Sequence, residues 1–363
     1  MKIIILGAGM IQFEAVEYLS SINIEVHILS NTKPQFRQDY YKHFENIDIR
    51  NREEVLQYCK YNSIDLIYSV GSDFAILTAS YISEKLGLKQ FNSLFSTELL
   101  QNKKLFRYFL KKHGISNINF LTTKNVSDLN NWNIFPCVIK PVDSQGQRGV
   151  AIVNSQAELA ERFPFSLSFS GNSEVIVEEF LRGKEISINV FVTNGEITYF
   201  FISDRITASG TNSGIPWRHI IPSTIPENIA EKALTKSKAV IKEAKIKNGP
   251  VYFQMKYTEQ DIEIIEVTPR LDGCHLWRLI DFYSGKNLLK LTFDRLLGIS
   301  DKPDSGTKHR GKFYIEFKLQ KPGEKYIDIN EKSLFRIPYY KKGQIIQPTN
   351  GILEKTIMYL KKG

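Results

Sequence analysis

A lysine directly before a glycine-containing loop is the first feature of this 363-residue sequence that could do chemistry. Residues 136–150 read PCVIKPVDSQGQRGV, in which the apolar residues 137–139 predict a buried strand that delivers Lys140. An ammonium group binds phosphate oxygens, and backbone N–H groups of a glycine loop can close over the others. The pattern therefore indicates a triphosphate site. The P-loop order G-x-x-x-x-G-K-[ST] is absent, and an ordinary hairpin is the alternative.

Carboxylates follow at the ends of two later predicted strands. Residues 175–181 (VIVEEFL) are an apolar run that leads into adjacent glutamates, and a third glutamate, Glu185, comes shortly afterwards. Residues 251–257 and 263–267 predict a strand pair whose second strand carries Glu266. A carboxylate at this place can bind Mg²⁺, and Arg270 supplies a cation just beyond it.

Each feature alone also has a purely structural explanation, because surface lysines and solvated strand ends are common. Together, in this order, they resemble the ATP-grasp superfamily, and among its branches the carbamoyl-phosphate-synthetase-like and carboxylate–amine ligases. The resemblance implies a mixed α/β and α+β fold. A Rossmann-like pre-ATP-grasp domain (1–95) precedes a two-lobed ATP-grasp module (96–300, hinge near 178–181), and a small β-rich segment (301–363) follows.

The resemblance also implies which residues hold ATP. These are two phosphate-binding lysines, the flexible loop over the phosphates, the adenine-binding hinge and the acid that accepts the ribose hydroxyls: Lys103 and Lys140; Ser144, Gln145, Gly146, Gln147, Arg148 and Gly149; Glu178, Glu179, Phe180 and Leu181; and Glu185. Asn102 stands where the family usually has Asp before the first lysine.

Two departures concern the metal. Glu266 matches the central Mg²⁺ ligand, but Gln254 replaces the usual outer carboxylate and Thr268 replaces the usual Asn. Mg²⁺ accepts neutral oxygens and keeps several waters, so all three residues are expected to bind it. The weaker charge compensation leaves open whether one or two ions bind, and whether the domain binds ATP without turnover.

The reaction implied by the resemblance joins a carboxylate to an amine through an acyl-phosphate, and converts ATP to ADP and phosphate. Arg270 is expected to stabilise the acyl-phosphate with Lys140, because forked guanidinium groups suit carboxylates and phosphates. The predicted substrate residues are Arg270, Arg278, Arg205, Arg218 and Asp73. His275 and Trp277, which follow a glycine, are expected to be packing residues rather than ligands.

Three other functions stay open at this stage. A kinase on the same fold would leave a phosphorylated product without an amine, and a binding module would hold ATP without turnover. A nucleic-acid binder would use the last 63 residues, which carry 14 Lys and Arg against 7 Asp and Glu within a net charge of +9. Those basic residues alternate with acids and β-type residues, which favours a solvated sheet face.

The first 95 residues must position one side of this site. Residues 2–6 and 24–29 predict parallel strands around a helix, followed by a helix over 51–61, a strand over 64–70 and a helix over 74–86. Gly7-Ala8-Gly9 lacks the third glycine and the ribose acid of a dinucleotide site, so a structural turn is expected. Asp73 lies where open α/β sheets bind ligands, and an N-cap role is the alternative.

A single Lys-rich helix is predicted over residues 96–113, ending at Gly114. Cys59, Cys137 and Cys274 are far apart, which excludes a disulfide framework and a CxxC zinc site and favours a cytoplasmic location. No apolar run reaches the length of a membrane span, and residues 1–10 do not fit a signal peptide. Small-molecule substrates are expected, with a homodimer as one open oligomeric state.

Overall fold

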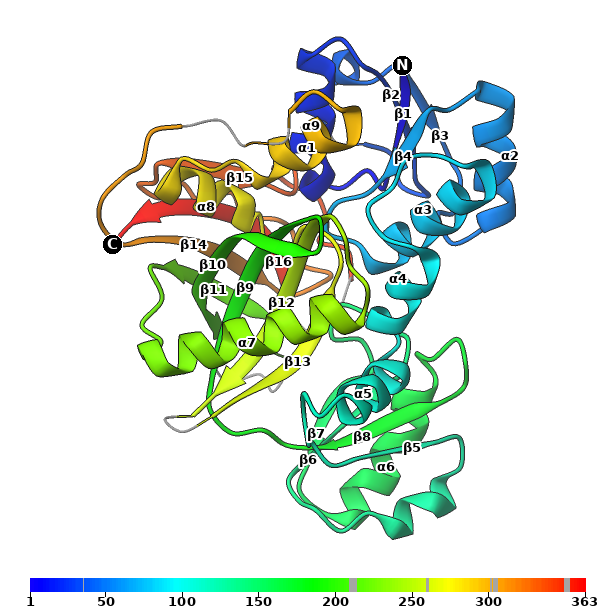
Figure 1. Ribbon diagram of the computed structural model, residues 1–363, viewed down its shortest axis with the longest axis vertical. Helices are drawn as coiled ribbons and strands as arrows, with labels where there is room; N and C mark the ends of the chain where they lie inside the picture. Colours follow the sequence, from blue (N-terminus) through cyan, green and yellow to red (C-terminus); the bar gives the residue numbers. More distant parts are fainter. Residues whose placement is uncertain (35, 209–213, 259–260, 301, 303–305, 349–352) are drawn as a thin grey trace.

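The computed structural model describes residues 1–34, 36–208, 214–258, 261–300, 302, 306–348 and 353–363 (Figure 1). Three sheets organise this part of the chain: a parallel sheet near the N-terminus, a small antiparallel sheet, and an eight-stranded sheet that includes the C-terminal strands. No helix in these ranges is both long and apolar enough to cross a membrane.

The N-terminal sheet is parallel, with the order β3-β2-β1-β4. Ile3, Ile4 and Ile5 have no exposed surface because helices cover both faces, and parallel sheets need this cover. The elements are β1 (Lys2–Leu6), α1 (Met10–Ser21), β2 (Glu25–Leu29), the 3₁₀ turn η1 (Gln38–Tyr40), β3 (His43–Glu45), α2 (Arg52–Asn62), β4 (Leu66–Tyr68) and α3 (Asp73–Leu86). The predicted α/β domain is confirmed in type, and the short strand β3 is an addition.

The helix predicted over residues 96–113 is wrong in one respect, since two helices meet at Asn102. Helix α4 (Leu94–Gln101) ends and α5 (Lys103–Lys112) begins there, because Asn102 has an extended backbone with φ −79° and ψ 111°. Its side-chain oxygen accepts a hydrogen bond from the Leu105 amide at 3.1 Å, as an N-cap does. This break turns Lys103 toward the glycine loop.

The small sheet has the order β5-β8-β6-β7 and forms the lobe at the bottom of Figure 1. Helix α6 packs on it around Leu159 and Phe163, which leaves the other face of β6 and β8 toward the rest of the molecule. Its elements are β5 (Phe120–Thr123), the 3₁₀ helix η2 (Val126–Asn131), β6 (Cys137–Pro141), β7 (Ala151–Val153), α6 (Gln156–Leu167) and β8 (Val175–Glu179).

The large sheet has the order β13-β12-β9-β10-β11-β14-β16-β15. Helix α7 packs against one face with Ile186, Ile188 and Val190, whereas α8 and α9 pack against the other face. The elements are β9 (Lys184–Thr193), β10 (Glu196–Thr207), β11 (Pro216–Ile221), α7 (Glu227–Glu243), β12 (Gly249–Tyr257), β13 (Ile262–Thr268), α8 (Leu276–Ser284), α9 (Leu288–Leu297), β14 (Phe313–Gln320), β15 (Phe335–Pro338) and β16 (Glu354–Lys362).

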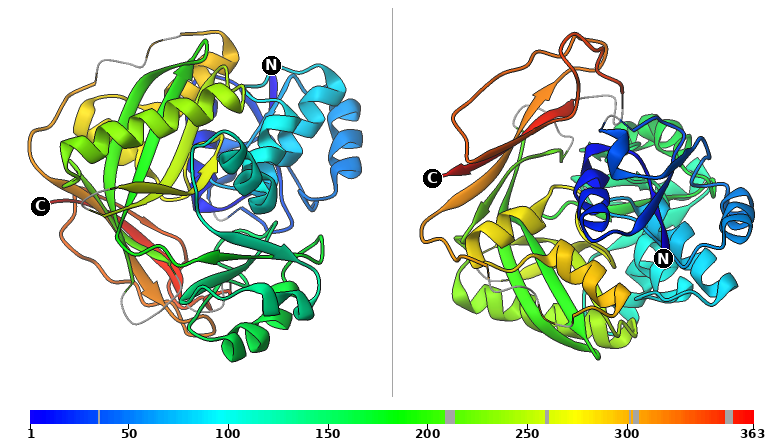
Figure 2. Two further views of the ribbon diagram at one scale, coloured as in Figure 1. Left: turned by 60° about the horizontal axis from the view of Figure 1, so that its bottom comes forward. Right: turned by 90° about the horizontal axis from the view of Figure 1, so that it is seen from above.

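The C-terminal strands continue this sheet. Strand β14 pairs antiparallel with β11 in the register Arg218↔Glu316, and β16 pairs with β14 (Figure 2, orange and red strands). The predicted β-rich character of the last segment is therefore confirmed. Its strands share one hydrogen-bonded sheet with β9–β13, which brings residues near position 340 and 355 to the same face as β12 and β13.

Candidate functional site

Two adjoining cavities lie where the three sheets meet. The narrower cavity, of about 160 Å³, is lined by the small sheet, the loop after β6 and the strands β12 and β13. The wider cavity, of about 670 Å³, also reaches the N-terminal glycine turn and the C-terminal strands. The two share the loop residues 145–148 together with Gln254 and Glu266. A ligand in one cavity would therefore meet a ligand in the other at these shared residues.

Lys140 lies on β6 in the narrow cavity, beside a buried glutamate. Its Nζ is 2.6 Å from Glu178 Oε2, while Arg107 Nε donates to Glu178 Oε1 at 2.9 Å. Arg107 comes from α5 and also donates to the backbone oxygen of Ile264 at 2.8 Å, so the ion cluster joins α5, β6, β8 and β13. Burial alone would raise the pKa of Glu178, but the two cations hold it at about 2. Burial also lowers the pKa of Lys140, and Glu178 opposes this effect.

The glycine loop after β6 lies over the junction of the cavities. Lys103 Nζ donates to the Ser144 carbonyl at 2.6 Å, and the Asp73 amide donates to Gln145 Oε1 at 2.9 Å. Gly149 has φ +72°, and a Cβ there would approach Pro141 Cγ to 2.8 Å, so a larger residue would displace the loop. The loop is held from α5 on one side and from α3 on the other.

The segment after β8 lies at the far side of the narrow cavity, which Glu179, Phe180, Leu181 and Glu185 also line. Lys256 Nζ donates to the Leu181 carbonyl at 3.1 Å and lies 4.7 Å from the centre of the Phe180 ring. Glu185 is 3.5 Å from the same ammonium and accepts hydrogen bonds from Arg205 and Gln254. The expected hinge and ribose residues thus share one wall of the cavity, although the Glu178 carboxylate points to Lys140.

The expected metal ligands lie side by side on β12 and β13. Gln254 and Glu266 are direct cross-strand partners, and Thr268 is two residues further along the same strand. Alternating residues share one face of a strand, so these side chains point the same way. Thr268 Oγ1 is buried and has no hydrogen-bond partner in the described structure. An amide oxygen, a carboxylate and an orphaned hydroxyl form an all-oxygen set, which fits a Mg²⁺ ion.

Arg270 connects the wide cavity to the N-terminal domain. Its Nε donates to Asp73 Oδ1 at 2.8 Å, and its NH1 donates to the Leu271 carbonyl at 2.8 Å. Asp73 is the first residue of α3, and Ser72 is the N-cap, so the alternative N-cap role for Asp73 is wrong. The Asp73 carboxylate holds the Arg270 guanidinium at the cavity wall, which both residues line.

Comparison with known proteins agrees with this geometry. Residues 133–276 match the family model described as the ATP-grasp domain. The chain thus contains an ATP-grasp domain over these residues. The matched range of the ATP-grasp domain runs from β6 to the start of α8, and contains Lys140, the loop, Glu266 and Arg270.

Two curated relatives and one solved structure illustrate what this chain is similar to. The carbamoyl phosphate synthase large chain of Clostridium acetobutylicum is 21% identical over 334 residues, which are 84% of this chain and 31% of that protein. Dapdiamide A synthase of Enterobacter agglomerans is 27% identical over 213 residues, 56% of this chain and 50% of that protein. The chain thus spans half or less of these relatives.

The L-amino acid ligase from Bacillus licheniformis has the same fold as this chain, with a TM-score of 0.82 at 16% identity. The superposition covers 99% of this chain and 93% of that chain. It includes the N-terminal sheet and the C-terminal strands, so the similarity in fold extends beyond the ATP-grasp domain itself.

Two of the substrate residues predicted from the sequence lie outside both cavities. Arg278 pairs with Glu14 at 2.9 Å and stacks on Phe335, and Arg218 pairs with Glu316 and stacks on Trp217 and Tyr314. Neither residue lines a cavity wall, because Arg278 points toward α1 and β15, whereas Arg218 pairs along its own sheet with the neighbouring strand β14. Arg205 does line the wide cavity, where it faces Glu185 and the Gly214 carbonyl.

His275 and Trp277 are packing residues, as expected. His275 Nδ1 is 3.0 Å from Glu14 Oε1, and Trp277 Nε1 donates to Glu14 Oε2 at 2.9 Å. Both side chains are almost fully buried. They tie α8 to helix α1 of the N-terminal domain.

Sequence reasoning missed several residues of the cavities. Arg107 pairs with Glu178, and Lys256 pairs with Glu185. The C-terminal segment adds Tyr339, just after β15, and Lys355 on β16 to the wide cavity. Lys355 Nζ lies 3.1 Å from Cys274 Sγ. The signal for Arg107 was present: a cation stands between the buried Phe106 and Phe109 on an amphipathic helix. No comparable signal links position 355 to the site.

The glycine turn at the N-terminus is filled by a side chain. Gln12 stands where a dinucleotide site has its third glycine. Its Oε1 accepts a hydrogen bond from the Gly9 amide at 3.0 Å. Its Nε2 donates to the Val70 carbonyl at 2.6 Å. The turn is therefore closed by Gln12, and it lines the wide cavity through Ala8 and Gly9.

Proposed function

We propose that this chain is an ATP-dependent ligase that joins a carboxylate substrate to an amine through an acyl-phosphate. The observation that carries the proposal is the junction of the two cavities. Lys140, Glu185 and the loop surround the narrow cavity, while Arg270 and Arg205 line the adjoining wide cavity. ATP in the first cavity would present its terminal phosphate at Glu266, where a second substrate can reach it.

The first step is attack of a substrate carboxylate oxygen on the γ-phosphorus. A bond forms between them as the bond from the γ-phosphorus to the leaving ADP oxygen breaks. Lys140 neutralises phosphate charge, and its pairing with Glu178 fixes the ammonium in place before ATP binds. Gln254, Glu266 and Thr268 would hold Mg²⁺, which when bound screens the charge of the phosphate oxygens.

The second step is attack of the amine nitrogen on the acyl carbon. A tetrahedral oxyanion forms, the nitrogen loses a proton, and phosphate leaves with the electrons of its bond to the acyl carbon. Arg270 is the cation that would stabilise this oxyanion, because Asp73 and the Leu271 carbonyl hold it at the cavity wall. The loop over the junction would exclude water that hydrolyses the acyl-phosphate.

The lining of the wide cavity favours a small, anionic acid substrate. Arg205, Arg270 and Lys355 all reach it, and forked or primary cations bind carboxylates and phosphates. We expect Mg·ATP as the nucleotide and small molecules as both substrates. We also expect a cytoplasmic location, which the three free cysteines support. The oligomeric state that we propose to test first is a homodimer.

The proposal is tested by ADP release with Mg·ATP against a panel of acids, each with and without amines. The variants Lys140→Ala and Glu266→Gln serve as site controls, and Lys124→Ala, an exposed lysine outside both cavities, is the matched control. ADP release that needs an acid and an amine, and that only the site variants lose, supports the ligase. Release with an acid alone and a stable phosphorylated product would instead identify a kinase.

A further inference from the structure

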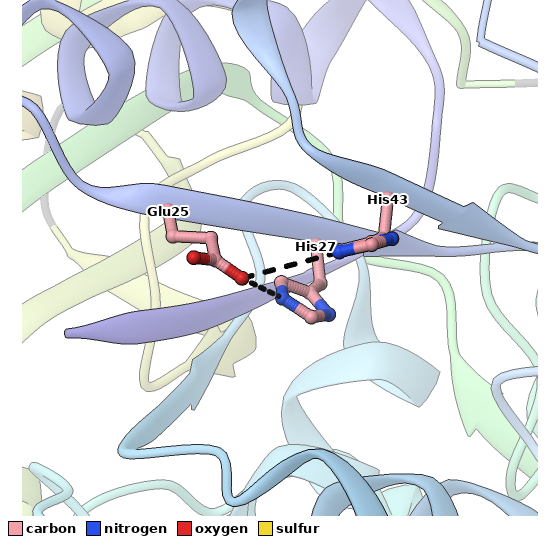
Figure 3. A group of neighbouring side chains, drawn as sticks. All are labelled: Glu25, His27 and His43. Carbon is pink, nitrogen blue, oxygen red and sulfur yellow. Dashed lines mark hydrogen bonds and ion pairs between the residues drawn. The ribbon is translucent and has the colours of Figure 1, made fainter.

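A second cluster of chemically active side chains lies in the N-terminal sheet, away from both cavities. Glu25, His27 and His43 place one ligand atom each within 4.8 Å of one another (Figure 3). Within the described ranges, no other group of three His, Cys, Asp or Glu side chains meets this condition. None of the three lines either cavity, so the proposed ligase chemistry does not use them.

The backbone builds this cluster directly. Glu25 and His27 are two residues apart on β2 and therefore share one face of the strand. His43 on β3 is the parallel register partner of His27, so its ring lies beside that of His27 with 4.6 Å between ring centroids. Figure 3 shows the Glu25 carboxylate directed toward both rings. The strand pairing itself, rather than a loop, sets the positions of all three.

The interatomic distances suit a small divalent ion. Glu25 Oε1 is 3.0 Å from His27 Nε2 and 4.0 Å from His43 Nε2. Bonds of about 2.0–2.1 Å in a tetrahedral site place ligand atoms about 3.3 Å apart. A small rotation of the His43 side chain, which is 47% exposed, would bring its nitrogen to this separation. Such a site keeps its fourth position open to water.

The surroundings prepare His27 for coordination. Its other nitrogen, Nδ1, lies 2.8 Å from the Tyr58 hydroxyl, so the ring can carry its proton there and turn a lone pair of Nε2 toward the ion. The ammonium of Lys2, on the neighbouring strand β1, donates to the Asn62 carbonyl at 3.0 Å.

We propose that Glu25, His27 and His43 bind one divalent transition-metal ion of the Zn²⁺ type and fasten the edge strand β3 to β2. Two imidazoles and one carboxylate are the donor set that such ions prefer over Mg²⁺. Strand β3 has three residues and lies at the edge of its sheet, so it has little hydrogen bonding of its own. The ion would add a link between the two strands that the backbone alone lacks.

The test measures Zn²⁺ binding to the full chain, freed of metal by a chelator and kept in Mg²⁺ to occupy sites for hard cations. Competition against a chromophoric chelator should give one Zn²⁺ per chain, and Co²⁺ should give the visible absorption of a low-coordinate nitrogen and oxygen site. His43→Gln and Glu25→Gln should each lower Zn²⁺ affinity at least about tenfold and abolish the Co²⁺ spectrum. Both positions are partly exposed, so the apo variants should keep the circular dichroism of the parent.

His113→Gln is the matched control, because His113 pairs with Glu243 at 3.2 Å but has no second histidine. It should bind Zn²⁺ as the parent chain does. Zn²⁺ should also raise the unfolding temperature of the parent and of this control, but not of His43→Gln. Equal affinity in the parent and in His43→Gln, or an equal loss in His113→Gln, would overturn the proposal. Ligase activity plays no part in these readouts, so the two proposals fail separately.

Discussion

Two buried glutamates, Glu14 and Glu178, both lie among cations and hydrogen-bond donors, but only the partners of Glu178 reach a cavity. Burial would raise the pKa of each, yet cationic and hydrogen-bonding partners hold both at about 2. The partners of Glu178 include Lys140, whose ammonium lines a cavity. The partners of Glu14 are His275, Trp277 and Arg278, none of which lines a cavity.

The difference shows that a strongly shifted carboxylate does not by itself mark an active site. Around Glu178, the cluster holds one cation where a phosphate can reach it. Around Glu14, the same kind of cluster joins helices α1 and α8, and its partners bind one another rather than a ligand. Perturbed pKa values arise in both settings, so the adjoining cavity is the observation that separates function from packing.

The largest expected effect on activity is at Lys140, the cation that pairs with Glu178. Lys140→Ala should lower kcat/KM for ADP release by about 10²–10³-fold, or about 3–4 kcal/mol, because one preorganised charge for the phosphates is lost. Its free energy of unfolding should change little by comparison, since Arg107 still pairs with Glu178. Steady-state kinetics and urea unfolding on one preparation separate these effects. A variant that kept full turnover would remove Lys140 from the mechanism.

Glu14→Gln should give the opposite pattern. Loss of the carboxylate leaves the Arg278 guanidinium without its counter-charge and weakens the buried hydrogen bonds to His275 and Trp277, which should cost about 3 kcal/mol of unfolding free energy. The kcat/KM of the folded fraction should stay within about threefold of the parent. Urea denaturation together with active-site titration tests this. A large loss of kcat at unchanged stability would mean that the Glu14 network takes part in turnover.

The acid dependence of stability should sharpen the same contrast. A depressed pKa means that the Glu14 carboxylate stabilises the fold above its unfolded value of 4.5, and that this contribution disappears as the pH falls toward 2. Between about pH 6 and pH 3.5, Glu14 should account for about 1–2 kcal/mol of lost stability. The free energy of unfolding of the parent, measured across this pH range, should therefore fall more steeply with acid than that of Glu14→Gln. Parallel curves would show that the carboxylate is not shifted.

The smallest effect is expected at Arg278. Arg278→Lys keeps the charge beside Glu14 and changes no cavity wall, so KM for the acid should change less than about threefold. Arg270→Lys is the matched comparison, because it exchanges the same residue types inside the wide cavity and loses the forked contacts to Asp73. Arg270→Lys should lower kcat/KM by about 100-fold. Equal losses of kcat/KM in the two variants would mean that Arg278 takes part in substrate binding as Arg270 does.

The sequence was most informative where the chemistry is local. Lys140, its proline and the glycine loop are contiguous, so their joint pattern survives without a structure. The expectations for helix and strand types in the first 95 residues were met because apolar runs and helical periodicity are also local signals. The break at Asn102 was missed because a helical apolar pattern continues across it, and only the cap geometry reveals the turn.

The pairings that the sequence did not predict join residues separated by long stretches of chain. Arg107 and Glu178 are 71 residues apart, Arg270 and Asp73 are 197 apart, and Glu14 and Arg278 are 264 apart. Arg270 and Arg278 looked alike in sequence, as two arginines flanking a glycine turn. Their side chains diverge because one follows the end of β13 into the cavity and the other lies on α8 against α1.

The sequence by itself determined the order of the elements, the lysine and glycine loop, the carboxylates at strand ends and hence the resemblance to the ATP-grasp superfamily. Periodicity, turn chemistry and residue type fix these features within a few positions along the chain. Only the tertiary structure decided which cations face a cavity, how β14–β16 complete the sheet, and that Glu25, His27 and His43 meet. These outcomes depend on strand register and on packing between distant segments, and no local pattern encodes either.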